Sequence, residues 1–475
     1  MNKTNNKPFF AHLVGIGGNG LSSLARIYAA KGYLVSGSDH DTSEFIIGLE
    51  NLGVKIYSNH SMSNVSPNID LLVYSSAVPT EHIEIVTANQ MGKRVIPSPI
   101  AFSEMVNESF GITVAGSHGK STTTAMIAWM LTELGQDPAF SIGAYSYNLG
   151  TNGRWGNGPF VFETDEYNGA ISLVRPQVAV ITNVDYDHPD IYPSLDEYKN
   201  IFNTYLENSA ANGIIIYPAE TTWLASSQSS KHSKIWNFGE FHLSPTWSFK
   251  NVEKLSNGIT KYDLCYKSKF LRTVNLRIPG VHNILNSIAA LAAIASIELS
   301  VEKASETLNE FSGIKSRLDV IGIYKKTLII NDFASHPLEA SAAIKAARQF
   351  NPRRLRCVYF PNSYHKNELF ASYLKSSFME ADEVLVTNLK GIDDYGEIVV
   401  RDTKYVADNI LQEHSNVMHL KNFEMAAEYL INTILPGDLI LTLGPWIPNP
   451  ITEILIENFS RDMDFFKGLI PEKWY

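Results

Sequence analysis

A short glycine-rich loop constrains this chain more than any other feature. Residues 116–121 read Gly-Ser-His-Gly-Lys-Ser, directly after the strand-like run ITVA and before the helical pattern TTTAMIAWMLTEL. The glycines let the backbone approach a bound group, the lysine supplies a charge for phosphates, and the serine hydroxyl can bind Mg²⁺. The order strand, loop, helix therefore predicts an α/β domain with a phosphate site. A structural turn is the alternative, because a full P-loop would have a glycine where this chain has Val114.

Strand-like and helical patterns alternate in three successive rounds, which predicts three α/β domains in series. We place them at residues 1–108, 109–315 and 316–475. The first and third should be Rossmann-like. The middle one should have a mostly parallel sheet of the P-loop ATPase type, and alternating stretches between about 240 and 278 predict additional antiparallel strands there.

Composition excludes some classes of partner. The chain has a formal net charge of −10 and a pI near 5.7, which argues against binding along a nucleic-acid backbone. No apolar run approaches the roughly 20 residues of a membrane span. We therefore expect a cytoplasmic enzyme that acts on small molecules without nucleic acid or membrane, as a monomer or homodimer.

A second glycine cluster, Gly-Ile-Gly-Gly-Asn-Gly at residues 15–20, follows the strand-like run FFAHLV and precedes a helical pattern. Such glycines bring the backbone close to a pyrophosphate at a helix N-terminus, and Asp39, at the end of the next strand-like run, can accept ribose hydroxyls. The pattern fits NAD, FAD or another diphosphate nucleotide, and a tight structural turn also remains open.

Several motifs in conforming order resemble the Mur ligase superfamily, most closely its alanine-adding branch. They are HLVGIGGNG, VAGSHGKSTTT, FETDEYNGA, ITNVDYDH, IPGVHNILNSIAA, GIKSRLDVIG and NDFASHPLEA. Together they span about 340 residues. The resemblance implies an ATP-dependent, ADP-forming ligase that makes an acyl phosphate on a UDP-N-acetylmuramate-like carboxylate and joins it to an amino acid, L-alanine or a different amine.

The resemblance also implies a catalytic role for Lys120, Glu163 and His188, with Mg²⁺ held by Ser121, Glu163 and His188. Hard oxygen ligands suit Mg²⁺, so Glu163 also makes chemical sense without the family. A histidine at a strand end is the plainer interpretation of His188. The implied ATP site comprises Gly116, Ser117, His118, Gly119, Lys120, Ser121, Thr122, His282, Asn283, Arg317 and Asp332.

By the same resemblance, the first domain holds UDP and not NAD. The expected UDP-substrate residues are Gly15, Gly17, Gly18, Asn19, Gly20, Ser38, Asp39, Ser75 and Ser76.

The motifs of the third domain depart from the alanine-adding enzymes. Where these have a tyrosine and a histidine, this chain has Phe333 and Ser335. A segment with two arginines is replaced by FPNSYHKN, and lysine cannot form the planar fork of an arginine. The expected acceptor-side residues are Phe333, Ser335, His336, Asn362, Ser363 and Lys366. The acceptor is therefore left open.

Two other functions compete with the ligase. A nucleotide-binding oxidoreductase would explain the first glycine cluster but leaves Lys120, Ser121 and Glu163 without a role. A catalytically silent binding subunit would have no chemical need for Lys120, Ser121, Glu163 and His188 together.

Overall fold

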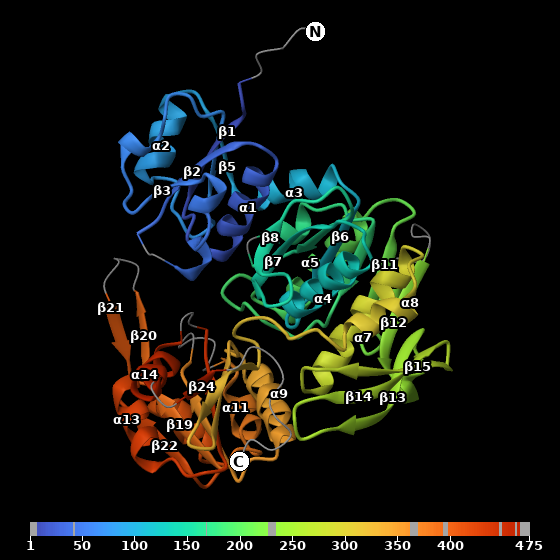
Figure 1. Ribbon diagram of the computed structural model, residues 1–475, viewed down its shortest axis with the longest axis vertical. Coiled ribbons are helices and arrows are strands. Elements are labelled where there is room, and N and C mark those ends of the chain that lie inside the picture. Colours follow the sequence, from blue (N-terminus) through green and yellow to red (C-terminus); the bar gives the residue numbers. More distant parts are fainter. Residues whose placement is uncertain are drawn as a thin grey trace. The chain divides into compact units, whose positions relative to one another are not determined.

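The computed structural model describes residues 7–40, 43–167, 169–226, 234–361, 369–392, 398–445, 449–460 and 463–465. The chain divides into two compact units, and helices cover sheets in each of them (Figure 1). The first unit comprises Met1–Ser248, Cys265–Lys269 and Asn286–Thr307, and the second comprises Phe249–Leu264, Phe270–Leu285 and Leu308–Tyr475.

The N-terminal sheet has the strand order β3-β2-β1-β4-β5, and every neighbouring pair is parallel. This order reverses between β1 and β4, and in such sheets ligands bind beyond the carboxyl ends of the strands at that point. The strands are β1 (Phe10–Val14), β2 (Leu34–Ser38), β3 (Lys55–Tyr57), β4 (Leu71–Tyr74) and β5 (Arg94–Pro97).

Helices cover both faces of this sheet. Successive strand residues point to opposite faces, so Leu13 packs in one core with Leu24 of α1 and Phe102 of α3, while Val14 packs in another with Ile85 of α2. The helices are α1 (Asn19–Ala30), α2 (Ile83–Gln90) and α3 (Ser98–Asn107), with short turns η1 (Glu44–Ile46), η2 (Glu50–Leu52) and η3 (Met62–Asn64).

The middle sheet contains seven neighbouring strands in the order β12-β11-β10-β6-β9-β7-β8. Its pairs are parallel except β7 with β8. The central strand β6 therefore ends between the ends of β9 and β10. The strands are β6 (Gly111–Ala115), β7 (Ala139–Ser146), β8 (Thr151–Arg154), β9 (Phe160–Glu163), β10 (Val178–Ile181), β11 (Ile214–Pro218) and β12 (Lys234–Glu240).

One core joins the N-terminal and middle sheets. The ring of Phe102 stacks on Phe162 with centroids 5.0 Å apart, and Tyr198 of α5 belongs to the same core. A polar contact adds to it, because the amide of Asn152 donates to the side chain of Asn19 at 2.7 Å. The helices of this region are α4 (Lys120–Glu133), α5 (Leu195–Asn208), α6 (Trp223–Ser226), α7 (Val281–Ser296), α8 (Val301–Thr307), η4 (Ala170–Ser172) and η5 (Phe241–Leu243).

The additional strands expected between about 240 and 278 are present. They are β13 (Trp247–Lys254), β14 (Thr260–Tyr266) and β15 (Lys269–Leu276), in neighbouring order. Only Lys267 and Ser268 connect β14 to β15, and both have positive φ, 47° and 62°. This is the backbone of a tight hairpin, so the two strands run antiparallel.

The C-terminal sheet has the order β22-β19-β18-β23-β17-β16-β24. The strands from β22 to β17 are parallel, and β16 pairs antiparallel with both β17 and β24. The strands are β16 (Asp319–Tyr324), β17 (Thr327–Asp332), β18 (Arg354–Tyr359), β19 (Glu383–Thr387), β22 (Val417–Leu420), β23 (Asp438–Leu443) and β24 (Met463–Phe465), with a separate pair β20 (Leu389–Ile392) and β21 (Ile398–Arg401).

Two cores lie on opposite faces of the C-terminal sheet. One contains residues of α9, α11 and α12, and the other contains residues of α13 and α14. These helices are α9 (Pro337–Ala347), α11 (Ala371–Ser377), α12 (Lys404–Ile410), α13 (Phe423–Thr433) and α14 (Pro450–Phe459), with η6 (Arg348–Phe350).

The predicted fold class, three α/β domains with mostly parallel sheets, is confirmed. In the part of the chain that the structure describes, none of the helices has the length and apolarity needed to cross a bilayer.

Candidate active site

The loop at residues 116–119 connects β6 to α4, as the sequence predicts. Gly116 and Gly119 have φ of 137° and 78°, which L side chains rarely adopt. A Cβ at Gly119 would also lie 2.5 Å from Oδ1 of Asn286. No side chain caps the start of α4, so the N–H groups of its first turn, where Thr122 lies, can face an anion.

The end of β10 holds this loop in place. The Asn183 amide oxygen accepts from the backbone N–H of His118 at 2.9 Å, and the Thr182 hydroxyl donates to the His118 carbonyl at 2.6 Å. The Ser117 hydroxyl donates to the carbonyl of Asp185 at 2.7 Å. The motif ITNVDYDH was singled out only for His188, so its first half has a positioning role that the sequence did not indicate.

Lys120 pairs with a buried carboxylate that was not among the predicted site residues. Its Nζ lies 3.0 and 3.1 Å from the two carboxylate oxygens of Glu166 and 2.6 Å from the carbonyl of Gly116. Burial opposes the charge on Lys120, but the carboxylates of Glu166, Asp165 and Glu163 raise its pKa above the ordinary value. Lys120, the first residue of α4, is therefore permanently charged.

Glu166 is completely buried, and its environment keeps it ionised. Burial by itself would raise its pKa, but Lys120 and a hydrogen bond from His188 lower it below the ordinary value. The neighbouring Asp165 differs, because burial raises its pKa in spite of Lys120. The FETDE segment is thus a partly buried acidic cluster around Lys120 and not a solvated acidic loop.

Ser121 and Glu163 meet at the edge between β6 and β9. The Ser121 hydroxyl donates to Oε1 of Glu163 at 2.9 Å, and the backbone N–H of Gly143 donates to Oε2 at 2.6 Å. A Cβ at Gly143 would overlap the Glu163 carboxylate. A hydroxyl and a carboxylate at one point are hard oxygen donors of the kind that Mg²⁺ takes.

His188 lies at the same edge. Its Nε2 is 3.6 Å from Oε1 of Glu166 and 3.5 Å from Oδ2 of Asp187. The backbone of His188 is left-handed, with φ of 56°, a conformation that is uncommon outside glycine but that histidine adopts more often than most residues. Glu166 therefore links Lys120 to His188, and all three predicted catalytic side chains gather on one sheet edge.

The glycine cluster of the first domain forms the turn between β1 and α1. Gly15 has φ of 88°, and its N–H donates to the carbonyl of Ser38 at 2.9 Å. The N–H of Gly17 donates to Oδ2 of Asp39 at 2.8 Å. A Cβ at Gly15 would lie 3.1 Å from Cβ of Ser75, so the ends of β1, β2 and β4 come together.

The remaining predicted UDP residues take different positions. Gly18 is the N-cap of α1 and has no side chain to cap the helix, which leaves its N-terminus open to an anion. Asn19 accepts from Asn152, and Gly20 lies against the ring of Phe102, so both contribute to packing. Ser76 is exposed beside the end of β4.

Arg317 and Phe333 form a cation–π pair in the third domain. The guanidinium lies 4.7 Å from the centroid of the Phe333 ring. Asp332 accepts from the backbone N–H of Leu318 at 2.7 Å and from that of Ala334 at 2.8 Å. The aromatic ring is thus retained at a position where the sequence departs from the motif that it resembles, and it contacts the arginine that was predicted to reach ATP.

Asp332 should make stability depend on pH. Burial, partly offset by Arg317, raises its pKa from 3.8 to about 6. The folded protein therefore holds this proton more tightly than the unfolded chain does, and its stabilising contribution is lost as pH rises from about 4 to about 6, by about 3 kcal/mol. Asparagine does not titrate, so the Tm of Asp332→Asn relative to wild type should rise across this range.

The control for this prediction is Asp263→Asn. Hydrogen bonds from Thr273 and Asn251 lower the pKa of Asp263, so this variant should lose stability relative to wild type as pH rises toward about 4, and the difference should stay constant above that pH. Thermal unfolding of both variants at several pH values tests the pair. A Tm difference for Asp332→Asn that does not change with pH would contradict the prediction.

The acceptor-side residues are only partly described. His336 is the N-cap of α9, where Nδ1 accepts from the N–H of Leu338, and Glu339 completes the capping box. The carbonyl of Ser335 accepts from the Tyr359 hydroxyl at 3.0 Å. The other three predicted residues, Asn362, Ser363 and Lys366, lie outside the described residues.

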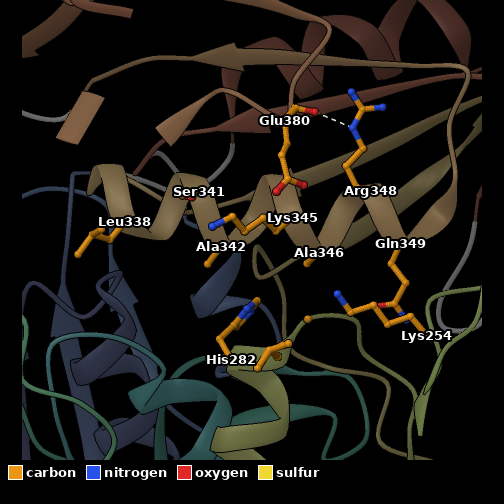
Figure 2. A pocket seen from close by; sticks show the side chains of 12 residues that line it. Lys254, His282, Leu338, Ser341, Ala342, Lys345, Ala346, Arg348, Gln349 and Glu380 are labelled. Carbon is orange, nitrogen blue, oxygen red and sulfur yellow. Dashed lines mark hydrogen bonds between the residues drawn. The ribbon is translucent and has the colours of Figure 1, made fainter. Parts of the chain in front are cut away.

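A cavity of about 500 Å³ lies between the start of α7 and helix α9. Figure 2 shows His282 pointing toward Ala346 and Lys345 of α9, and Glu380 and Arg348 above them. Burial lowers the pKa of His282 to about 4, so its imidazole is neutral. The amide of Asn283 donates to the carbonyl of Pro279 at 2.7 Å. The cavity is within the size range of small-molecule sites.

Comparisons with known proteins agree along most of the chain. Residues 11–110 match the Mur ligase family catalytic domain, 114–294 the Mur ligase middle domain, and 316–445 the Mur ligase glutamate ligase domain. The UDP-N-acetylmuramate--L-alanine ligase of Desulforamulus reducens is 34% identical over 436 residues, which cover 91% of this chain and 94% of that protein.

Two solved structures are similar as well. A UDP-N-acetylmuramate-alanine ligase from Thermotoga maritima has a TM-score of 0.79 at 24% identity and shows the fold. A murein peptide ligase from Psychrobacter arcticus has a TM-score of 0.72 at 26% identity. In each comparison 95% of this chain and 99% of the other are covered. With its phosphate loop, acidic sheet edge and relatives in agreement, this chain belongs to the Mur ligase family and is an ATP-dependent, ADP-forming amide ligase.

Proposed function

We propose that this ligase activates the carboxylate of UDP-N-acetylmuramate, or a close analogue, as an acyl phosphate and joins it to an amino acid or short peptide. The observation that carries the proposal is the gathering of Lys120, Ser121, Glu163 and His188 at one sheet edge. The name of the 34% identical relative supports the carboxyl donor.

Each group at this edge has a proposed role. The N–H groups of the loop and of the first turn of α4 bind the phosphates, and the Lys120 ammonium neutralises the transferring group. Ser121 and Glu163, with His188, would hold Mg²⁺, and their oxygen donors fit that ion. When bound, Mg²⁺ neutralises charge on the phosphate oxygens. Asn183 and Thr182 keep the loop in its geometry.

The chemistry needs two displacements. The substrate carboxylate attacks the γ-phosphorus of ATP, which releases ADP and leaves a mixed anhydride. The amine then attacks the acyl carbon, loses a proton and expels inorganic phosphate. Both steps move negative charge onto phosphate oxygens, which is what a preorganised cation such as Lys120 stabilises.

We propose that His282, Asn283, Arg317 and Asp332 contribute to binding the base and sugar of ATP, as the family resemblance implies. His282 lines a cavity of suitable size, and its neutral ring can pack against a purine. Asn283 has the donor and acceptor to read a base edge. Arg317, in contact with Phe333, suits phosphate charge, and Asp332 suits ribose hydroxyls.

UDP is proposed to bind at the carboxyl edge of the N-terminal sheet. Gly15, Gly17 and Gly18 bring the backbone and the N-terminus of α1 close to a diphosphate. Ser38, Asp39, Ser75 and Ser76 lie at the ends of the two adjacent strands. Reading this edge as a dinucleotide site of an oxidoreductase, or the chain as a silent subunit, is not favoured, since the relatives are ligases.

The acceptor is where this chain differs from the alanine-adding pattern. Phe333 and Ser335 replace a tyrosine and a histidine, and the segment with Asn362, Ser363 and Lys366 lacks the expected arginines. An arginine fork is the usual receptor for an amino-acid carboxylate. We therefore propose an acceptor other than free L-alanine, and the similar murein peptide ligase makes a peptide one candidate.

An acceptor panel tests both parts of the proposal. The enzyme is incubated with ATP, Mg²⁺, UDP-N-acetylmuramate and, in parallel, L-alanine, other amino acids and an L-alanyl peptide. Phosphate release with one acceptor, and a product mass equal to the two substrates less water, supports it. Turnover with L-alanine alone would overturn the altered acceptor but leave the ligase, whereas no product with any acceptor would count against the proposed donor.

The domain limits, the oligomeric state and the cellular location are also proposals. The domain limits 1–108, 109–315 and 316–475 are supported by the spans of the three family models. We propose a monomer or homodimer that works in the cytoplasm, where ATP is available.

A further inference from the structure

Histidines gather around one buried glutamate in the first domain. His60 follows β3, while His82 is the N-cap of α2 and Glu84 lies in its first turn. One ligand atom from each of these three residues lies within 4.8 Å of the others. Nδ1 of His60 is 3.7 Å from Oε2 of Glu84, close to the roughly 3.3–3.6 Å between two ligands of a tetrahedral ion with bonds of about 2.0–2.2 Å.

A third imidazole is in contact with this cluster. The rings of His40 and His60 have centroids 4.3 Å apart, and those of His60 and His82 are 4.5 Å apart, both nearly perpendicular. His60 and His82 are partly buried, and His40 is exposed. The cluster is therefore reachable from solvent on the side of His40, while the carboxylate closes its inner side.

The carboxylate of Glu84 is oriented by its neighbours. Oε1 accepts from the backbone N–H of Ser61 at 2.9 Å and from the amide of Asn64 at 2.7 Å. Oε2 lies 2.5 Å from the Ser38 hydroxyl and 3.3 Å from Nε2 of His12. Such outer partners position metal-binding carboxylates in proteins. They leave Oε2 on the side that faces the histidines.

The Ser38 hydroxyl bridges the two groups that are closest. It donates to Oε2 of Glu84 and lies 2.9 Å from Nδ1 of His60. A cation between His60 and Glu84 would take over this bridging position, and the hydroxyl can rotate about its χ1 bond to make room or contribute an oxygen of its own.

We infer that His60, His82 and Glu84 bind a transition-metal cation of the Zn²⁺ class, with His40 at the rim of the site. Two imidazoles and one carboxylate are a common donor set for Zn²⁺ and are a poor one for Mg²⁺, which prefers oxygen. The site is thus chemically distinct from the one at Ser121 and Glu163. It adjoins Ser38 and Asp39, so a bound ion would lie beside the proposed UDP edge.

The test is a Co²⁺ titration of the full chain without nucleotide, followed by visible absorption. A four- or five-coordinate site with nitrogen ligands gives intense d–d bands, whereas an octahedral oxygen site gives weak ones. We expect one equivalent of strongly absorbing Co²⁺, displaced by Zn²⁺ and retained in excess Mg²⁺. Absence of the bands, or their loss on adding Mg²⁺, would overturn the inference.

Variants locate the ion. His60→Ala and His82→Ala should each weaken Zn²⁺ binding, measured by competition with Co²⁺, by about tenfold or more. His242→Ala is the matched control, because His242 is exposed and pairs with Glu240 on another domain. A Ser121→Ala/Glu163→Gln double variant should keep the bands. Bands that persist in His60→Ala/His82→Ala, with its fold intact by circular dichroism, would contradict the assignment.

Discussion

Lys120→Ala is expected to lower ATP-dependent phosphate release by about 10³-fold or more, because a preorganised cation at the transferring phosphate is lost. The ammonium lies at the start of α4, beside the loop N–H groups, and remains charged because Glu166, Asp165 and Glu163 surround it. Phosphate release and ADP formation measure the effect. Lys303→Ala, an exposed lysine of α8, is the control and should leave turnover unchanged.

The same substitution leaves Glu166 as a buried charge without its nearest cation, which typically costs about 3–5 kcal/mol. Loss of activity and loss of folding must therefore be separated. The double variant Lys120→Ala/Glu166→Gln removes the orphaned charge and should recover most of the Tm lost by Lys120→Ala, but not its turnover. Unchanged ATP turnover in Lys120→Ala would show that the active site is elsewhere.

Glu163→Gln is expected to lower the turnover number by about 10²–10³-fold and to raise the Mg²⁺ concentration needed for half-maximal rate. Glutamine keeps the shape of the side chain and can still accept from Ser121, but it lacks the charge that suits a divalent cation. A titration of phosphate release against Mg²⁺ measures both effects. Glu133→Gln, at the exposed far end of α4, is the matched control.

Gly143→Ala supplies an independent check on Glu163. The added methyl group would overlap the Glu163 carboxylate and remove the donation from the Gly143 backbone. A shift of a positioned ligand costs about 10–100-fold in metal affinity or activity, so the Mg²⁺ requirement should rise with Glu163 itself intact. A normal Mg²⁺ profile in both variants would exclude Glu163 as a metal ligand.

The local sequence pattern was sufficient to predict the phosphate loop and the class of fold. Gly116 and Gly119 adopt positive φ, and this need is visible in the sequence because only glycine meets it without strain. The apolar spacing of α4 and of its preceding strand is equally local. For the same reason the run at residues 278–295 predicts a helix without knowledge of its neighbours, and the structure has α7 at Val281–Ser296.

The partners of these residues could not be predicted. Glu166 is 46 positions from Lys120, and Asn183 is 65 positions from His118. They meet because β6 lies between β9 and β10 in the sheet, and strand order is decided by the packing of the whole domain. No motif spacing encodes this order. The motif FETDE therefore predicted a site role for Glu163 but not for Glu166, which is the most buried of its acidic residues.

Departures from a family pattern were also easier to detect than to interpret. Phe333 lacks the hydroxyl of the tyrosine in the family pattern, but the centroid of its ring still lies 4.7 Å from the Arg317 guanidinium. His336, expected on the acceptor side, caps α9. The cluster of His40, His60 and His82 carries no sequence motif, since its members come from three separate loops.

What could be predicted from the sequence and what could not differ in the range of the interactions involved. Backbone conformation and the alternation of apolar residues depend on a few neighbours, so the amino-acid order alone specified the three α/β domains and the phosphate loop after β6. Charge pairing depends on which side chains share a buried space. Only the folded sheet, which brings Glu163 and Glu166 to one side of the loop and Asn183 to the other, decided that Lys120 is a partly buried, permanently charged cation.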